Sequence, residues 1–316
     1  MGVGSVEKQW LRRRFGEAVT FEEPMAQHTS LGVGGPAEVF AVPGTTEDLI
    51  RMMQWIQEEG LSYMVIGGGT NLLVNDGGIE GVVISLVRCL KGVSSSEGDN
   101  DPADITALAG SQTLALCRYA IDRGFAGMNF ALGIPGTIGG GIMMNAGTSY
   151  GSIESVLNRI TVLCPTGETE VIRREDLEFG YRSLTWERLE EADEKGPPIV
   201  ISGSFSLLAS DSQTLKEEAR SILREREQKQ PIHHPSAGSV FKNPASGKSA
   251  GELIEIAGLK GKRIGGAEVS EQHANFFINR GQASASDFLT LIAVVQDAVS
   301  TAFGVDLETE VTIVRS

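Results

Sequence analysis

Two glycine-rich stretches decide the fold of this chain. They are Gly67-Gly-Gly-Thr-Asn-Leu-Leu-Val74 and Gly133-Ile-Pro-Gly-Thr-Ile-Gly-Gly-Gly-Ile-Met-Met-Asn-Ala-Gly147. The first stretch directly follows an expected strand at 62–66. Because glycine lacks a Cβ, the backbone N–H groups of such loops can approach anionic oxygens closely. The pair therefore predicts a cradle that holds the pyrophosphate of a dinucleotide from two sides.

Neither stretch fits the two common phosphate-binding motifs. No Gly-Lys-Ser/Thr follows the first stretch, which excludes a Walker loop, and the residues from Asn71 onward are a poor helix opening for a Rossmann fingerprint. The competing interpretation is that each stretch is only a tight turn.

Composition and charge narrow the class of protein. The chain has 316 residues, of which 39 are Gly, and its 27 Lys+Arg against 41 Asp+Glu give a net charge of −14. So negative a chain is a poor binder of nucleic acid polymers, and its length predicts two or three domains. It lacks a signal-peptide pattern and a run of about 18 apolar residues, which predicts a cytoplasmic protein, with a plastid location after transit-peptide removal left open.

Cysteine and histidine usage predicts no metal site. The three cysteines are widely spaced and lack a CxxC pattern, which favours apolar burial in a reducing compartment over disulfides or zinc; they are Cys89, Cys117 and Cys164. The adjacent His233 and His234 have no Cys or His partner at zinc spacing.

Hydrophobic periodicity predicts a mixed α+β fold. Turn residues and polar stretches at 94–104 and 189–198 predict exposed connections, and we divide the chain into 1–90, 91–210 and 211–316. Strands are expected at 38–42, 62–66, 105–109, 199–208, 275–278 and 307–314, a hairpin at 159–164 and 169–173, and helices at 45–60, 114–122, from 212, 250–257 and 284–303.

Several motifs outside the glycine stretches carry a family resemblance. Together with the glycine stretches, these motifs make the chain resemble the UDP-N-acetylenolpyruvoylglucosamine reductase (MurB) family. The resemblance is to the shorter subtype, which lacks a tyrosine-bearing insertion. This family stands within the wider group of vanillyl-alcohol-oxidase-like FAD-binding domains. The motifs are HTSLGVGGPAE (28–38), FGYRS (179–183), PSAGSVFKNP (235–244), AGLKGKRIGGAEVSEQHANFFIN (257–279) and LETEV (307–311).

The resemblance implies a two-part, PCMH-type FAD-binding region in residues 1–90 and 91–210, and a C-terminal substrate-binding domain in 211–316 whose last strand may return to the FAD region. It implies non-covalent FAD, and no histidine stands in either glycine stretch, where related oxidases often attach FAD covalently. The implied FAD-binding residues are Gly67, Gly68, Gly69, Thr70, Asn71, Leu72, Gly133, Ile134, Pro135, Gly136, Thr137, Gly139, Gly140, Asn145, Ala146 and Gly147.

The resemblance also implies a reaction. NADPH reduces FAD, and the reduced FAD gives a hydride to the enolpyruvyl double bond of UDP-N-acetylglucosamine enolpyruvate, forming UDP-N-acetylmuramate for peptidoglycan. Arg182 and Glu310 would stabilise the enolate and Ser239 would protonate it. Read without the motifs, Arg182 and Glu310 are surface charges and Ser239 is a turn residue.

Four further residues match substrate-contacting positions of the family: Tyr181, Lys229, Asn243 and His273. A basic stretch from Ser239 to Arg263 supports an anionic ligand. Its five cations against two acids give 5 − 2 = +3; they are Lys242, Lys248, Lys260, Lys262 and Arg263, against Glu252 and Glu255.

Two other functions compete with this reductase. One is a different FAD-dependent oxidase or dehydrogenase of the same fold, and the other is a nucleotide-binding module without turnover. For the reductase we expect UDP-N-acetylglucosamine enolpyruvate and NADPH as partners, no nucleic acid, no membrane and no metal, and a monomer.

Overall fold

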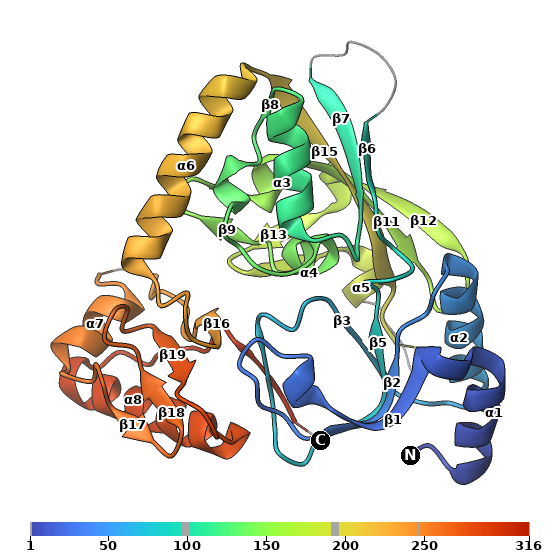
Figure 1. The fold of residues 1–316 in the computed structure, drawn as a ribbon, viewed down its shortest axis with the longest axis horizontal. Coiled ribbons are helices and arrows are strands. Elements are labelled where there is room, and N and C mark those ends of the chain that lie inside the picture. Colours follow the sequence, from blue (N-terminus) through green and yellow to red (C-terminus); the bar gives the residue numbers. More distant parts are fainter. Residues whose placement is uncertain (1, 96–101, 191–195, 246, 316) are drawn as a thin grey trace. The chain divides into compact units, whose positions relative to one another are not determined.

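The computed structural model describes residues 2–95, 102–190, 196–245 and 247–315. They form two compact units, and Figure 1 labels helices and strands of both. Both units combine helices and sheets, so the α+β prediction is confirmed. Unit 1 contains Met1–Phe21, Glu38–Gly68 and Glu80–Arg224, and unit 2 contains Glu22–Ala37, Gly69–Ile79 and Glu225–Ser316.

The larger sheet of unit 1 has the strand order β12-β11-β15-β7-β6, with β8 also paired to β15. All its pairs are antiparallel, and the expected hairpin is β11 with β12. Alternate residues of β7 are buried, as the two-residue period of a strand with one covered face requires. The strands are β6 (Val93–Ser95), β7 (Ala103–Leu108), β8 (Phe125–Ala126), β11 (Leu157–Leu163), β12 (Thr169–Arg173) and β15 (Ile199–Ala209).

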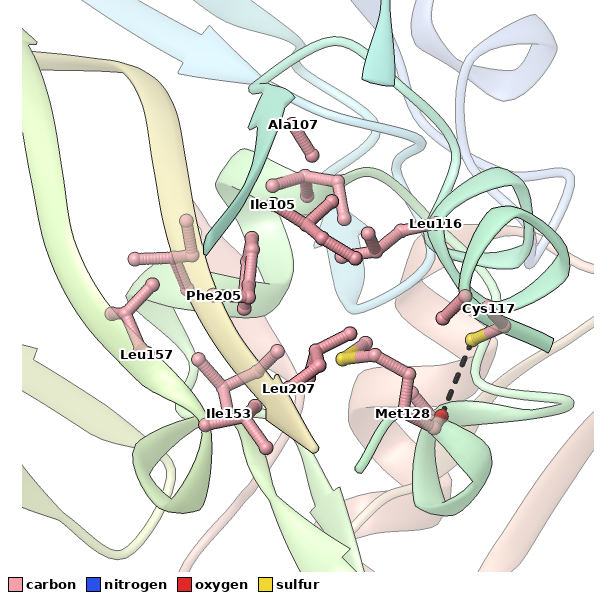
Figure 2. Close-up of a cluster of buried hydrophobic side chains, with 14 of the residues drawn as sticks. Ile105, Ala107, Leu116, Cys117, Met128, Ile153, Leu157, Phe205 and Leu207 are labelled. Carbon is pink, nitrogen blue, oxygen red and sulfur yellow. Dashed lines mark hydrogen bonds between the residues drawn. The ribbon is translucent and has the colours of Figure 1, made fainter. Parts of the chain in front are cut away.

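Helix α3 (Thr113–Asp122) buries its apolar face in the same core as this sheet (Figure 2). The Cys117 thiol contacts the Met128 carbonyl at 3.4 Å, and burial raises its pKa to about 12. The thiol is therefore protonated at neutral pH and acts as a core residue. Cys164 is also buried, but its sulfur accepts a hydrogen bond from Arg188 at 3.1 Å, and Cys89 is half-buried. Burial is therefore confirmed for two of the three cysteines, and apolar surroundings for Cys117.

A second sheet of unit 1 contains the strand that directly precedes the first glycine stretch. Its strand order is β1-β2-β5-β3, and β3 pairs parallel with β5. The Thr45 hydroxyl accepts a hydrogen bond from the Asp48 N–H at 3.1 Å and caps the N-terminus of helix α2, as the sequence predicts. The elements are α1 (Ser5–Phe15), α2 (Thr46–Glu58), β1 (Val19–Pro24), β2 (Pro36–Ala41), β3 (Tyr63–Ile66) and β5 (Ile79–Ser85).

The glycine cluster suggests a loop over residues 133–147, but part of this stretch is a helix. Helix α4 (Ile138–Met143) forms despite three glycines because Ile138 and Ile142, four positions apart, are both completely buried. The remaining small elements of unit 1 are β9 (Gly147–Thr148), β10 (Gly151–Ser152), β13 (Glu178–Gly180), β14 (Ser183–Thr185) and α5 (Glu187–Glu190).

Unit 2 contains an antiparallel sheet with the order β16-β19-β18-β17 and a separate parallel pair, β20 with β4. Helix α6 starts in unit 1 and its last residues belong to unit 2. The elements are β4 (Leu72–Val74), α6 (Ser212–Lys229), β16 (Ser236–Ser239), α7 (Ala250–Ile256), β17 (Arg263–Ile264), β18 (Ala267–Val269), β19 (Phe276–Asn279), α8 (Ala285–Phe303) and β20 (Thr312–Val314).

Helix α8 is the one helix of the described residues that is long and apolar enough to cross a membrane, with 19 residues and a mean hydropathy of 1.2. One of its faces lies in the core of unit 2, and its opposite face carries exposed polar residues such as Asp297. This pattern is that of a core helix of a globular unit. The buried residues are Ala285, Phe288, Leu291, Ile292, Val295 and Val299.

The expected last strand at 307–314 is wrong in its first half, because only Thr312–Val314 pairs with β4. Residues 308–311 instead bond to the segment after β16. The connections expected at 94–104 and 189–198 overlap the end of β6, the start of β7 and the end of α5, and residues 96–101 and 191–195 lie outside the described residues. The three-part division at 90 and 210 stays a prediction.

Asp76 attaches the end of the first glycine stretch to the N-terminus of α8. Its carboxylate accepts the Ala285 N–H at 2.8 Å, and the Ser286 N–H and hydroxyl at 2.9 and 2.6 Å. These hydrogen bonds lower the pKa of Asp76, and the bond from the Ser286 hydroxyl lowers it most. The carboxylate thus stabilises the folded state at neutral pH, and this contribution is lost as pH falls through the lowered pKa.

We expect Asp76→Ala to lower the free energy of unfolding by about 1 kcal/mol at pH 7, since it removes a helix cap. The difference from wild type should shrink as pH falls below about 4, where the unfolded chain takes up a proton at Asp76 that the folded wild type binds only at lower pH, because its pKa is lowered. Urea unfolding at both pH values measures it. The control is Asp297→Ala, an exposed carboxylate of the same helix, which should not destabilise. A difference that stays constant down to pH 3 would contradict the capping role.

Candidate functional site

The two glycine stretches meet within unit 1. A Cβ at Gly67 would overlap the Thr137 side-chain oxygen, so the close approach requires glycine. The second stretch is held by residues that follow β7: the Ile138 N–H donates to the Ser111 carbonyl at 2.8 Å, and the Gly139 N–H to the Ala109 carbonyl at 2.9 Å. The two stretches approach each other closely at this point, and their holding of a pyrophosphate stays a prediction.

Asn145 connects the second stretch to the hairpin β13–β14. Its side chain is buried, its amide donates to the Gly180 carbonyl at 3.1 Å, and its Oδ1 accepts the Glu154 N–H at 3.0 Å. Its φ of 39° lies in the left-handed region, which asparagine tolerates better than most residues. An expected FAD-binding residue therefore positions the hairpin that carries Arg182.

Arg182 occupies the two-residue turn of that hairpin, between the paired Gly180 and Ser183. Its φ of 58° is unusual for a residue with a long side chain, and such backbone conformations cluster at functional sites. The guanidinium lies 5.2 Å from the centre of the Tyr181 ring, and that ring is 53% exposed. The turn thus presents both residues at the surface of unit 1.

In unit 2, the first stretch continues from Gly69. Its φ is 61°, and a Cβ there would overlap the His28 carbonyl, so this position also requires glycine. The Asn71 amide donates to the Glu310 carbonyl at 3.0 Å, and the Asn71 carbonyl accepts the Thr312 N–H at 2.9 Å. A residue expected at the cofactor therefore holds the backbone of Glu310 directly.

Ser239 and Glu310 are joined through one residue. The Val240 carbonyl, directly after Ser239, accepts the Glu310 N–H at 2.7 Å. Two of the three expected catalytic residues are therefore brought together in unit 2. Arg182 belongs to unit 1, and its meeting with the other two stays a prediction.

The other expected substrate residues of unit 2 have polar partners. The Lys229 ammonium pairs with Glu225 at 2.6 Å; this pair is solvent-exposed and therefore weak, so an anionic ligand could compete for the lysine. The Asn243 Oδ1 accepts the Ala250 N–H at 3.1 Å.

His273 is neutral rather than cationic at pH 7, because burial lowers its pKa. Its Nδ1 accepts the Asn275 N–H at 3.2 Å, which assigns the ring proton to Nε2. His273 is thus suited to donate a hydrogen bond to a ligand and adds no charge.

The sequence count of +3 between Ser239 and Arg263 overstates the available positive charge. Lys242 pairs with Glu308 at 3.2 Å, an acid from outside the counted stretch, and Lys260 pairs with Glu255 at 2.8 Å. The basic stretch is therefore partly neutralised in the fold.

The glycine stretches fit the pyrophosphate of a dinucleotide. Neither 67–74 nor 133–147 contains an acid, so nothing in them repels an anion, and each contains a threonine hydroxyl. The structure explains the glycines at Gly67 and Gly69, because a Cβ at either position would overlap neighbouring atoms. Among the described residues, no group of three or more His, Cys, Asp or Glu is placed to hold a metal ion.

Sequence reasoning missed the supporting segment 109–111 and the amide of Asn275, which is described below. A signal for the first existed in Gly110-Ser111 directly after a predicted strand. Asn275 stands within the motif at 257–279, but the motif did not indicate its hydrogen bonds, because its partners lie 34 residues away.

Comparison with known proteins agrees with these observations. Residues 230–314 match the family model described as UDP-N-acetylenolpyruvoylglucosamine reductase, C-terminal domain, and residues 37–173 match an FAD binding domain. The second match spans much of both expected FAD-binding parts. It supports an FAD-containing oxidoreductase.

Relatives of the whole chain carry the same name. The UDP-N-acetylenolpyruvoylglucosamine reductase of Desulfosudis oleivorans is 44% identical, over 97% of this chain and 98% of the relative. That of Geotalea uraniireducens is 45% identical, over 93% of both. These relatives are bacterial and give no support to a plastid location.

The crystal structure of the Thermus caldophilus enzyme (MurB) matches the fold. Its TM-score is 0.75 at 33% identity, and the match covers 93% of this chain and 97% of the other. With nearly full-length identity above 40%, the chain belongs to the UDP-N-acetylenolpyruvoylglucosamine reductase family of FAD-containing oxidoreductases.

Proposed function

We propose that this chain uses NADPH to reduce UDP-N-acetylglucosamine enolpyruvate to UDP-N-acetylmuramate, a peptidoglycan precursor, as a monomer in the cytoplasm. The observation that carries the proposal is the pairing of Ser239 and Glu310 through the Val240 carbonyl. It gives a proton donor and a carboxyl group a fixed relation in one unit, beside Asn71 of the first glycine stretch.

The glycine stretches would hold FAD through backbone N–H groups, with the hydroxyls of Thr70 and Thr137 and the amides of Asn71 and Asn145 alongside. When bound, FAD supplies hydride transfer between NADPH and the substrate. The contact of Gly67 with Thr137 keeps the two stretches close enough to serve one ligand.

Arg182 and Glu310 have complementary roles toward the substrate. Hydride addition to the β-carbon of an unsaturated carboxylate moves negative charge onto the carboxylate side. The guanidinium of Arg182 meets that charge with permanent positive charge and forked donors. Glu310 can stabilise the enolate only as a protonated or hydrogen-bonded carboxyl, since a bare carboxylate would repel it.

Ser239 completes the reaction by giving the proton of its Oγ to the α-carbon. A serine hydroxyl is a weak acid, so its contribution depends on being held close to the carbon that it protonates. The Gly238 φ of 77° turns the chain immediately before Ser239, and the pairing of Ser239 with Phe276 fixes the position of its backbone.

The substrate is held mainly from unit 2. Lys229 supplies positive charge for the diphosphate, and Asn243 and His273 supply hydrogen bonds. The exposed Tyr181 ring of unit 1 adds an aromatic face. Each of these groups is exposed or half-buried, as a binding side chain must be.

The test is an anaerobic experiment in two stages. NADPH should first bleach the flavin absorbance, and UDP-N-acetylglucosamine enolpyruvate should then restore it. If the substrate leaves the flavin reduced while oxygen reoxidises it rapidly, the chain is an oxidase of the same fold. Purified protein that is colourless and cannot be reconstituted with FAD would favour a binding module without turnover.

We expect Ser239→Ala to leave flavin reduction by NADPH nearly intact and to slow reoxidation by the substrate by about 10²- to 10⁴-fold, the range for loss of a proton donor. Stopped-flow absorbance separates the two stages. Ser236→Ala, on the same strand, is the matched control and should change neither. Equal loss in both stages would mean that Ser239 supports the fold or the FAD site.

We expect Gly67→Ala to weaken FAD binding by about tenfold or more, because the added methyl group forces the glycine stretches apart and overpacking costs about 1–3 kcal/mol. Titration of the apoprotein, followed by quenching of flavin fluorescence, measures the affinity. Gly44→Ala is the control, since its Cβ would meet only the Asp48 side chain at 3.7 Å. Equal FAD affinity in both variants would exclude a shared binding role for the two stretches.

A further inference from the structure

Asn275 is a buried amide that bonds to the segment directly after Ser239. Its side chain is only 4% exposed. Its Oδ1 accepts the Phe241 N–H at 2.9 Å, its Nδ2 donates to the Phe241 carbonyl at 2.8 Å, and its own carbonyl accepts the Val240 N–H at 2.8 Å. One residue therefore satisfies three backbone groups of two consecutive residues.

The same segment is held on its other edge by the stretch that contains Glu310. The Val240 carbonyl accepts the Glu310 N–H, and the Lys242 N–H donates to the Glu308 carbonyl at 2.9 Å. Ser239 and Glu310 are thus anchored to a segment whose backbone polar groups are divided between Asn275 and residues 308–311. A shift of that segment would move both expected catalytic residues together.

Asn275 is itself fixed by a tight turn. Its N–H donates to the His273 Nδ1, and the Phe276 N–H donates to the His273 carbonyl at 2.9 Å. The His273 ring packs edge-on against Phe276, with ring centres 4.8 Å apart. The turn leaves the Asn275 amide little freedom, so its direction is set before a ligand binds.

Only an amide side chain at position 275 can make both hydrogen bonds to the Phe241 backbone. One atom must accept from an N–H and the other must donate to a carbonyl. An aspartate can accept but, when ionised, cannot donate, and an alanine can do neither. Without these partners, the buried N–H and carbonyl of Phe241 would be unpaired, which raises the free energy of the folded state and favours a shift of this segment.

We propose that Asn275 is a positioning residue for the proton-transfer step, acting on Ser239 through the backbone of Val240 and Phe241. This inference rests on the proposed function, because it assigns Ser239 as the proton donor. Asn275 does not touch the substrate in this role. It sets the distance between the Ser239 hydroxyl and the carbon that receives the proton.

The experiment compares Asn275→Ala with wild type in both stages of the anaerobic assay, alone and combined with Ser239→Ala. Flavin reduction by NADPH should change less than about twofold, and reoxidation by UDP-N-acetylglucosamine enolpyruvate should slow by about 10- to 100-fold. In the Ser239→Ala background the same substitution should slow reoxidation less than about twofold, because residues that act as one unit are not additive.

Asn279→Ala is the matched control. Asn279 ends strand β19, which begins directly after Asn275, and its amide bonds to the Leu31 carbonyl at 2.9 Å, so its loss also removes a side-chain-to-backbone bond of unit 2. We expect it to leave the reoxidation rate close to wild type. Asn275→Asp provides a second test if Asn275→Ala does not fold, since it keeps the shape but sets a charged acceptor against the Phe241 carbonyl in place of the donor; it should also slow reoxidation selectively.

The proposal is overturned if Asn275→Ala slows reoxidation by the same factor with and without Ser239, or if folded Asn275→Asp reoxidises at the wild-type rate. Equal slowing of both stages, or equal slowing by Asn279→Ala, would overturn it as well. Failure of the wild-type protein to be reoxidised by the substrate would remove the proposed function itself, and this inference with it.

Discussion

The close approach of backbone to neighbouring atoms at Gly67 and Gly69 is the constraint on which the rest of the site depends. At both positions a Cβ would overlap an atom from a distant part of the chain, the Thr137 hydroxyl in unit 1 and the His28 carbonyl in unit 2. The chain passes from one unit to the other between Gly68 and Gly69. One short stretch therefore has residues with this constraint in each unit.

Hydrogen bonds from asparagine side chains to the backbone link the glycine stretches to the expected catalytic residues. In unit 1, Asn145 bonds to Gly180, at the base of the turn that presents Arg182. In unit 2, Asn71 bonds to the Glu310 carbonyl, and the Glu310 N–H bonds to the residue after Ser239. In each unit, hydrogen bonds thus connect a glycine stretch to the backbone near an expected catalytic residue and support its position there.

Local patterns predicted most of the regular elements. The helices at 46–58, 113–122 and 285–303 and the hairpin of β11 with β12 follow from periodicity, caps and turn residues. The pattern was misleading at Ile138–Met143, where two buried isoleucines outweigh three glycines, and at 308–311, where pairing with residues 240–242 replaces the expected strand. Both errors arise because a distant partner decides the local conformation.

The sequence by itself determined the family, the α+β class and the types of residue at the site, because glycine stretches and short motifs are local. The tertiary structure alone decided which of these residues share a unit. It placed Ser239 beside Glu310 through Val240, paired Lys242 with Glu308, and gave the buried amide of Asn275 its role. The physical reason is that a hydrogen bond between residues far apart in sequence is made only when the fold brings a donor and an acceptor within reach.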